Sequence, residues 1–329
     1  MLDKIDFVIL WVDGSDPAWL EEKKKYKTDL DTVDAVNRYR DWDNLKYWFR
    51  GVEKFAPWVN NIYFVTWGHL PKFLNTSHPK LKIVNHKDII DEKYLPTYNS
   101  NAIDMNVYKI QGLSEQFVYF NDDTFLINKT KPEDFFINGI PCDEFSENPI
   151  GPSQDNFTYT MFNNIAILSK YFEKQECKKR LKGKYYNIKY GKNNIRTMLL
   201  KPYRYFLGIH NPHISQSFLK SSFEKMYELE KEEMERTSSH RFREKSDITQ
   251  YLIRYYQLLN GNFVPRKSSF GQYFDASNDN KDIINAIIRQ KYSVICLNDS
   301  DDSYDFEKAK KEINEAFEKI MPEKSSFEN

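Results

Sequence analysis

The chain has 329 residues, of which 40% are hydrophobic and 29% charged, and its formal net charge is zero. This composition is typical of a globular protein and gives no reason to expect nucleic acid as a partner, while no apolar run approaches the length of a membrane span. Three widely spaced cysteines in no metal-ligand pattern, and the lack of a signal-peptide pattern at the start, predict a cytoplasmic protein with free thiols.

The first 120 residues alternate between predicted strands and predicted helices. Short apolar runs predict strands at 5–12, 61–67, 81–86 and 117–120. Helical spacing of apolar residues predicts helices from near Pro17, over 44–55 and over 102–113. This alternation is typical of an α/β fold with a mostly parallel, Rossmann-like sheet flanked by helices.

The rest of the chain is mainly helical in its pattern. We expect helices at 158–172, 221–235, 247–259, 281–290 and 306–320, and a last strand at 293–297. The stretch 173–205 shows only a weak helical signal at 194–201, and residues 170–220 hold 13 Lys and Arg against 2 Asp and Glu. We therefore expect one domain over 1–329 that contains a basic, partly helical insertion or substrate-facing lobe.

Two explanations fit the basic charge of this insertion. It suits a phosphate-bearing donor, an anionic acceptor or an anionic membrane surface. The simpler explanation is a lysine-rich loop that is merely solvated.

Three predicted strands end in acidic segments that also favour turns. The strand endings are Asp13-Gly14-Ser15-Asp16, Asn121-Asp122-Asp123 and Asn298-Asp299-Ser300-Asp301-Asp302. In open α/β sheets, ligands bind outside the carboxyl ends of the strands. Neighbouring carboxylates repel unless a cation or donor groups neutralise them, and Mg²⁺, with Mn²⁺ as the alternative, prefers such oxygen ligands. Each aspartate could instead cap a turn, but the repetition favours a shared acidic rim.

Histidines and arginines form two further clusters. His210 and His213 lie three residues apart, and His240 is followed by Arg241 and Arg243. Imidazole can act as a base or nucleophile near neutral pH, and guanidinium binds phosphate oxygens through two parallel donors. A capping histidine and solvent-exposed arginines are the alternatives.

Long segments of the chain resemble the conserved regions of the Stealth proteins. They are IDFVILWVDGSDP at 5–17, RYRDWDNLKYWFRGVEKFAP and WVNNIYFVTWGHLP at 38–71, LPTYNSNAIDMNVYKIQGLSEQFVYFNDD at 95–123, residues 210–247, CLND at 296–299 and the closing segment 322–328. The resemblance implies a sugar-1-phosphate transferase of capsular or cell-surface polysaccharide synthesis. Its donor would be a nucleotide-sugar, expected to be UDP-linked, and its acceptor a glycan or a lipid-linked oligosaccharide.

The resemblance also implies roles for individual residues. The acidic positions associated with the metal match Asp104, Asp122 and Asp123, and the later aspartate matches Asp299. Asp104 stands where the animal member of the family has a glutamate. The essential histidine and arginine match His213 and Arg243. Donor and phosphate contacts are expected from Asp13, Gly14, Arg40 and Arg241.

The expected reaction is attack of an acceptor hydroxyl on the sugar-proximal phosphorus, which releases a nucleoside monophosphate. Asp122, Asp123 and Asp299 would hold the cation, and Arg243 would bind the non-bridging oxygens. His213 would act as a general base or form a phospho-histidine. The alternatives are a metal-dependent glycosyltransferase that releases a nucleoside diphosphate, and a glycan-binding module with a decayed site. We expect the protein in the cytoplasm, peripheral at the inner face of the membrane.

Overall fold

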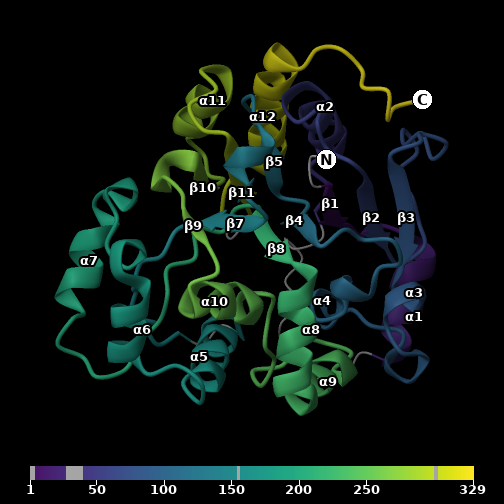
Figure 1. Ribbon diagram of the computed structural model, residues 1–329. Coiled ribbons are helices and arrows are strands. Elements are labelled where there is room, and N and C mark those ends of the chain that lie inside the picture. Colours follow the sequence, from purple (N-terminus) through teal and green to yellow (C-terminus); the bar gives the residue numbers. More distant parts are fainter. Residues whose placement is uncertain (1–3, 27–39, 154–155, 300–302) are drawn as a thin grey trace.

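The computed structural model describes residues 4–26, 40–153, 156–299 and 303–329 (Figure 1). Its central sheet has five strands in the order β3-β2-β1-β4-β8. The strands are β1 (Ile5–Leu10), β2 (Ile62–Thr66), β3 (Leu81–Asn85), β4 (Gln116–Phe120) and β8 (Gln216–Leu219). The first four are parallel and β8 runs antiparallel to β4. The predicted α/β fold with a mostly parallel sheet is confirmed.

The direction in which strands are added to the sheet changes at β1. β2 and β3 lie on one side of β1, while β4 lies on the other side, with Ile9 in register with Phe120. The carboxyl ends of β1 and β4 are therefore neighbours at the point where the strand order reverses. Ligands bind at this position in open α/β sheets, so the fold places the first two acidic strand ends at a suitable edge.

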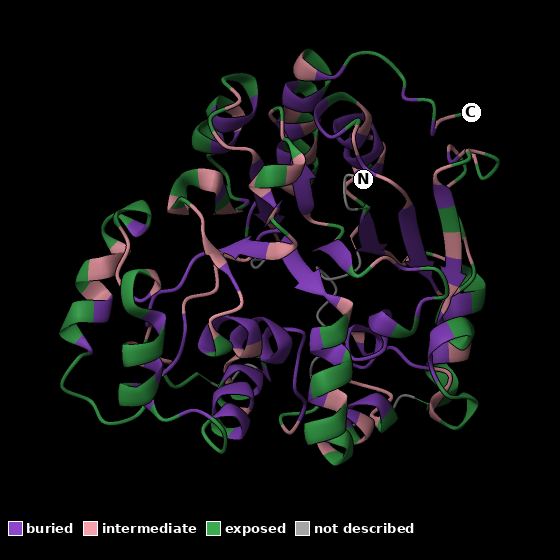
Figure 2. Ribbon diagram, viewed as in Figure 1, coloured by how far each residue is buried: buried purple, intermediate pink, exposed green. Residues whose placement is uncertain are grey.

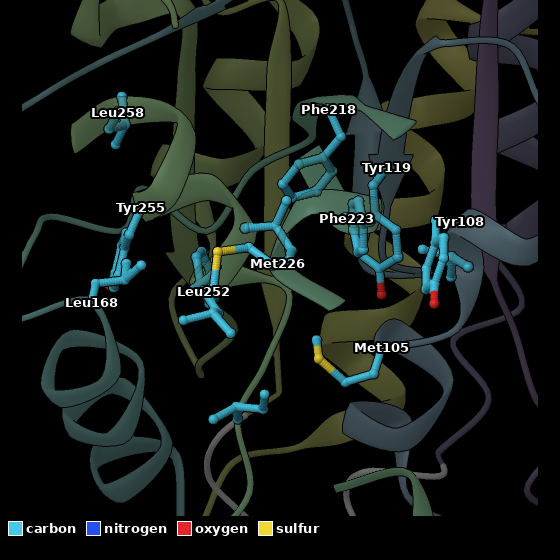
Figure 3. Close-up of a cluster of buried hydrophobic side chains, with 14 of the residues drawn as sticks. Met105, Tyr108, Tyr119, Leu168, Phe218, Phe223, Met226, Leu252, Tyr255 and Leu258 are labelled. Carbon is cyan, nitrogen blue, oxygen red and sulfur yellow. The ribbon is translucent and has the colours of Figure 1, made fainter. Parts of the chain in front are cut away.

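Both faces of the central sheet are buried (Figure 2). Phe7 and Ile9 of β1 join one core with α2 (Leu45–Phe55) and α12 (Phe306–Ile320). Val8 and Leu10 join the opposite core, which contains α8 (Lys220–Leu229) and α10 (Tyr251–Asn260) and is partly drawn in Figure 3. Burial on both faces explains why these strands are continuous apolar runs without alternation.

A second sheet corrects the expected position of the last predicted strand. β11 (Val294–Asn298) lies in a three-stranded sheet with β10 (Gly271–Asp275) and β5 (Thr124–Leu126), in the order β10-β11-β5. β5 follows β4 closely and pairs antiparallel with β11, with Thr124 opposite Cys296. The third acidic strand end therefore reaches the end of β4 from another sheet. A small third sheet contains β6 (Phe136–Ile137), β7 (Ile140–Asp143) and β9 (Val264–Pro265).

Several predicted helices agree with the structure, and two were wrong. α1 (Pro17–Tyr26), α2, α11 (Lys281–Ile288) and α12 form where expected. The predicted helix 102–113 is instead α4 (Ser100–Asp104) and a 3₁₀ turn at Val107–Lys109, and a further short helix, α3 (His86–Ile89), follows β3. The predicted helix 221–235 is two helices, α8 and α9 (Lys231–Ser239), separated at Glu230.

Local polar side chains explain where these helices stop. The Asn106 side chain donates to the Ala102 carbonyl at 2.8 Å and to the Ser238 hydroxyl at 2.9 Å, so it binds backbone that a longer helix would use. α10 begins at Tyr251 and not at 247, because the buried Asp247 carboxylate is occupied by a loop. Each effect also involves a partner that is distant in the sequence, Ser238 for Asn106 and Asn101 for Asp247.

The basic stretch contains more structure than its pattern indicates. α5 (Asn156–Leu168) leads into α6 (Lys174–Leu181), which was not predicted, and α7 (Asn193–Leu199) coincides with the weak signal. α6 has a mainly basic sequence and buries few apolar side chains, so it carries little helical periodicity. None of the described helices has both the length and the apolar character needed to cross a bilayer.

Gly51 allows α2 to pack closely on β5, the strand that follows the acidic pair. A Cβ at this position would lie 2.8 Å from the Leu126 carbonyl oxygen. We expect Gly51→Ala to lower the free energy of unfolding by about 1–3 kcal/mol, because overpacking outweighs a gain in helix propensity of about 1 kcal/mol. Urea denaturation measures this effect. Gly183→Ala is the matched control, since nothing lies within 4 Å of its Cβ, and equal losses in both variants would contradict the packing argument.

Candidate active site

Two antiparallel strand pairs, β4 with β8 and β5 with β11, bring distant residues to the carboxyl end of β4. β8 runs antiparallel to β4, with Tyr119 opposite Gln216, so the segment just before β8 lies at the carboxyl end of β4. This segment contains His213. β11 ends where β5 begins, and the Leu297 N–H donates to the Asp123 carbonyl at 2.8 Å. Topology therefore places His213 and the end of β11 beside Asp123.

Asp123 and His213 are in contact at the centre of the site. The Nε2 of His213 lies 3.5 Å from the Oδ2 of Asp123, and its Nδ1 lies 3.3 Å from the Tyr251 hydroxyl on α10. Thr124 donates to the other Asp123 oxygen at 2.9 Å. His213 has a positive φ of 47°, a conformation that is uncommon outside glycine and concentrates at functional sites. The imidazole is thus held between a carboxylate and a hydroxyl.

The two partners shift each other's proton affinity. Burial alone would lower the pKa of His213, but its hydrogen bond and charge attraction with Asp123 outweigh burial and raise it. Burial would raise the pKa of Asp123, yet His213, Thr124 and Cys296 stabilise the carboxylate and lower it. Asp123 is therefore ionised at neutral pH, and the basicity of the His213 imidazole is increased by it.

Cys296 belongs to the site, although the sequence pattern predicts only a free thiol at this position. Ligand atoms of Asp123, His213 and Cys296 lie within 4.8 Å of one another. Burial and the negative charge of Asp123 raise the pKa of Cys296 well above its usual value, so the group is a thiol that hydrogen bonds to Asp123. The ring of Tyr273 on β10 packs edge-on against His213. The CLND segment at 296–299 was the only sequence signal for this position.

Asp122 and Asp104 carry raised pKa values beside the same centre. The side chain of Asp122 reaches the surface, yet loss of water around it and the charge of Asp123 raise its pKa to about 7. Burial raises the pKa of Asp104 to about 7, partly offset by the Tyr119 hydroxyl, which donates to it at 2.5 Å. The charge of Arg243 lowers both values. The site therefore contains two carboxyl groups that a cation would help to ionise.

Arg243 is exposed and faces this acidic centre. Its Nη2 donates to the Ser100 hydroxyl at 2.6 Å, and its charge acts on Asp104, Asp122 and His213. The buried Asp247 carboxylate organises the loop that carries Arg243. The groups that donate to it are His240 at 2.6 Å, Asn99 at 2.8 Å, Asn101 at 3.0 Å and the Glu244 N–H at 3.0 Å.

The other two predicted phosphate-binding arginines are held differently. Arg241 donates to the carbonyls of Pro96 at 2.9 Å and Leu95 at 3.1 Å and stacks over the Tyr26 ring, an arrangement that fastens the 95–98 loop. Arg40 lies 3.5 Å from Asp299. Arg40 is thus beside the predicted site residue Asp299, while the guanidinium of Arg241 donates its hydrogen bonds to backbone carbonyls.

The remaining predicted positions surround the switch point. Asp13 accepts hydrogen bonds from the Ser15 N–H at 2.9 Å and its hydroxyl at 2.6 Å, and the Asp13 N–H donates to His69 at 2.8 Å. Gly14 follows in the same turn. Asp299 accepts from the Tyr304 hydroxyl at 2.7 Å. Asp301 and Asp302 lie outside the described residues.

His210 does not join His213, although the sequence places the two histidines close together. Its ring lies 3.7 Å from Glu144, and burial together with Arg196 and Arg254 lowers its pKa to about 4. The buried Arg254 on α10 binds this region: it donates to both oxygens of Asp143, to the His210 carbonyl and to the Asn211 side chain. Arg254 thereby anchors the loop that continues to His213.

The side chains at this centre include several that could hold a metal ion. Among the described residues, Asp123, His213 and Cys296 are the only group of three or more ligand atoms in this mutual range. This group has three protein ligands from an aspartate, a histidine and a cysteine, and it does not include Asp122. Two adjacent carboxylates, one of them accessible and raised in pKa by the other, suit a hard divalent cation. The four-aspartate metal site stays a prediction.

Two conserved regions of a known family match the chain. Conserved region 1 of the Stealth proteins matches residues 3–31 and conserved region 2 matches residues 38–142. The chain is 44% identical to the capsular polysaccharide phosphotransferase WcwK of Streptococcus pneumoniae, over 99% of this chain and 98% of that protein. The chain belongs to the Stealth family. Stealth membership makes it a phosphotransferase, and the prediction of an enzyme is confirmed.

Other Stealth relatives are similar along their whole length. The exopolysaccharide phosphotransferase cps2G of Lactiplantibacillus plantarum is 40% identical, over 98% of this chain and 96% of that protein. The receptor polysaccharide phosphotransferase WefC of Streptococcus oralis is 37% identical, over 99% of this chain and 100% of that protein. Among solved structures, a galactosyltransferase LgtC complexed with donor and acceptor sugar analogues is 10% identical over 94% of this chain and 95% of that chain, with a TM-score of 0.37. That structure is too distant to inform the chemistry of this site.

The contact between Asp123 and His213 predicts a measurable shift. With chelator present, we expect the pKa of His213 in Asp123→Asn to fall below that of the wild type, because the hydrogen bond and charge of Asp123 are lost while burial still lowers it. Histidine resonances followed by NMR across pH report this value. The exposed Asp279→Asn is the control, and an unchanged His213 titration in Asp123→Asn would contradict the pairing.

The anchoring by Arg254 predicts loss of both stability and turnover. Arg254→Met leaves the buried Asp143 without its partner, so we expect the free energy of unfolding to fall by about 3–5 kcal/mol. The turnover number should fall as well, because the 210–213 loop loses its anchor. Denaturation and steady-state assays measure the two effects. The exposed Arg289→Met should match the wild type, and a stable, fully active Arg254→Met would refute the anchoring role.

Proposed function

We propose that this Stealth protein transfers a sugar-1-phosphate from a UDP-linked nucleotide-sugar to a hydroxyl of a glycan or lipid-linked oligosaccharide. The transfer would build a phosphodiester into a capsular or cell-surface polysaccharide. The observation that carries this proposal is the Asp123–His213 pair beside Asp122 at the switch point of the sheet. The whole-length similarity to polysaccharide phosphotransferases supports it.

The first step of the proposed mechanism is proton removal by His213. Neutral imidazole takes the proton of the acceptor hydroxyl, and the ionised Asp123 stabilises the imidazolium that forms. The acceptor oxygen then forms a bond to the sugar-proximal phosphorus, while the bond from that phosphorus to the nucleotide phosphate oxygen breaks. The products are a sugar phosphodiester and a nucleoside monophosphate.

The remaining groups of the site would manage the negative charge of the donor. The exposed Arg243 is available to the non-bridging phosphate oxygens and is positioned by Asp247 through its loop. Arg40, beside Asp299, would contact the diphosphate, and Asp13 and Gly14 would line the nucleotide pocket. Asp122, Asp123 and Asp299 would hold a divalent cation, Mg²⁺ or Mn²⁺, which when bound neutralises phosphate charge.

His213 has a second chemically sound role. As a nucleophile it would attack the same phosphorus and form a phospho-histidine, which the acceptor hydroxyl would then cleave. Contact of the imidazole with both Asp123 and Tyr251 is compatible with either route.

The chain as a whole is proposed to act as one catalytic domain over residues 1–329. Its basic lobe, residues 173–205, would form part of that domain. We place its activity in the cytoplasm, at the inner face of the membrane where a lipid-linked acceptor would be found.

The released nucleotide tests the reaction type. Incubating the purified protein with a panel of UDP-sugars, acceptor and Mg²⁺ should release UMP, detected by mass. Release of UDP would show instead a glycosyltransferase that attacks the anomeric carbon. Omitting the divalent cation or adding EDTA should abolish UMP formation.

Variants test the site assignment in the same assay. We expect His213→Ala to lower turnover by about 10²–10⁴-fold and Arg243→Ala by about 10³-fold or more. Asp123→Ala should lower it comparably to His213→Ala. His78→Ala is a matched control because His78 packs against Phe327, away from the site, and should retain activity. Undiminished activity in both His213→Ala and Asp123→Ala would remove the assignment.

A further inference from the structure

The helix α7 has the reverse of the usual distribution of side chains. Its inward side is polar: Thr197 is buried and accepts a hydrogen bond from the Glu147 N–H at 3.0 Å, and Arg196 donates to the Asn148 side chain at 2.6 Å. Its outward side is apolar, with Ile195 and Met198 each 57% exposed and Leu199 69% exposed. A surface helix ordinarily turns its apolar side to the core.

The segment around α7 extends this apolar surface and adds positive charge. Of the 15 large hydrophobic side chains exposed among the described residues, six lie between 188 and 205. Ile188 is 94% exposed, and Tyr203 and Tyr205 are also exposed. The same segment holds five Lys and Arg and no Asp or Glu. We call residues 188–205 the α7 face; α7 lies at the edge of the molecule in Figure 1, and Figure 2 colours part of this segment as exposed.

Buried polar contacts hold the α7 face in place. Lys174 of α6 is buried and lies 2.8 Å from Glu147 and 2.8 Å from the Leu200 carbonyl at the end of α7. Lys189 donates to the Pro265 carbonyl at 2.8 Å. These contacts keep the polar residues inside, so the apolar residues remain outside. The exposure is therefore built into the fold of this lobe.

We propose that the α7 face docks on the surface of an anionic phospholipid bilayer. A short helix with aliphatic residues on one side, flanked by Lys and Arg, suits the boundary between lipid headgroups and acyl chains. Tyrosines are enriched at the same depth, and clustered basic residues are attracted to anionic lipid. A second copy of this face would bring positive charge against positive charge, and a glycan would not need exposed aliphatic side chains.

Vesicle sedimentation tests this proposal without substrate, so its result is independent of the proposed reaction. We expect the purified full chain to sediment with vesicles of phosphatidylglycerol and phosphatidylcholine. Binding should weaken as NaCl is raised, because salt screens the basic residues. Vesicles of phosphatidylcholine alone should bind the protein much less.

Two sets of variants separate the apolar and charged contributions. Met198→Ser with Leu199→Ser, and separately Lys192→Ala with Lys201→Ala, should each lower vesicle binding by about tenfold or more. Leu229→Ser with Ile288→Ser and Lys311→Ala with Lys319→Ala are matched controls on other exposed surfaces and should bind as the wild type. Activity with a soluble acceptor should be unchanged in all four.

Several outcomes would overturn the proposal. They are absence of binding to anionic vesicles, wild-type binding by both sets of α7-face variants, and a dimer in sedimentation velocity that these variants dissociate. A raised KM for a soluble glycan acceptor in the same variants would indicate a glycan site instead. Should the serine variant fail to fold, as judged by circular dichroism, the lysine pair at exposed positions still decides the question.

Discussion

The site depends on the repulsion between Asp122 and Asp123, two carboxylates that leave the end of one buried strand side by side. Two groups from other parts of the fold offset this repulsion. His213 contacts Asp123, and the positive charge of Arg243 on an exposed loop stabilises the ionised form of Asp122. Neither group is close to the pair in the sequence. His213 reaches it because β8 runs antiparallel to β4, and Arg243 reaches it on a loop that the buried Asp247 carboxylate organises. A divalent cation would neutralise the negative charge that remains on the two carboxylates, and the same cation would bind the donor diphosphate.

The helix α10 connects the catalytic centre with the basic lobe. Its Tyr251 contacts His213, and one turn further on its Arg254 binds Asp143 and the Glu144 carbonyl. The Glu144 side chain in turn accepts from Asn193 of α7. A buried arginine with all these partners contributes less to net stability than to the accuracy of the loops it joins, because desolvation offsets much of the attraction. A chain of contacts through α10 and Glu144 therefore links the active site with α7.

The sequence by itself predicted four of the five strands of the central sheet, most of the helices and the identity of the chemical groups, but not β8. Continuous apolar runs such as 117–120 are typical of strands buried on both faces, and adjacent aspartates after such a run favour a neutralising partner. The family pattern added His213 and Arg243, and the fold brings both to the acidic pair.

Only the tertiary structure decided which partners meet. It separated His210 from His213, assigned the guanidinium of Arg241 to the carbonyls of Leu95 and Pro96, and added Cys296 and Tyr251 to the centre. It also divided the 221–235 helix and turned the apolar side of α7 outward. The periodicity of apolar residues shows which face of a helix or strand is apolar. It does not show whether other parts of the protein pack against that face. The burial of an apolar face, and the ion pairs and hydrogen bonds between distant residues, depend on the order and direction in which the strands pair. A local sequence pattern does not contain that information.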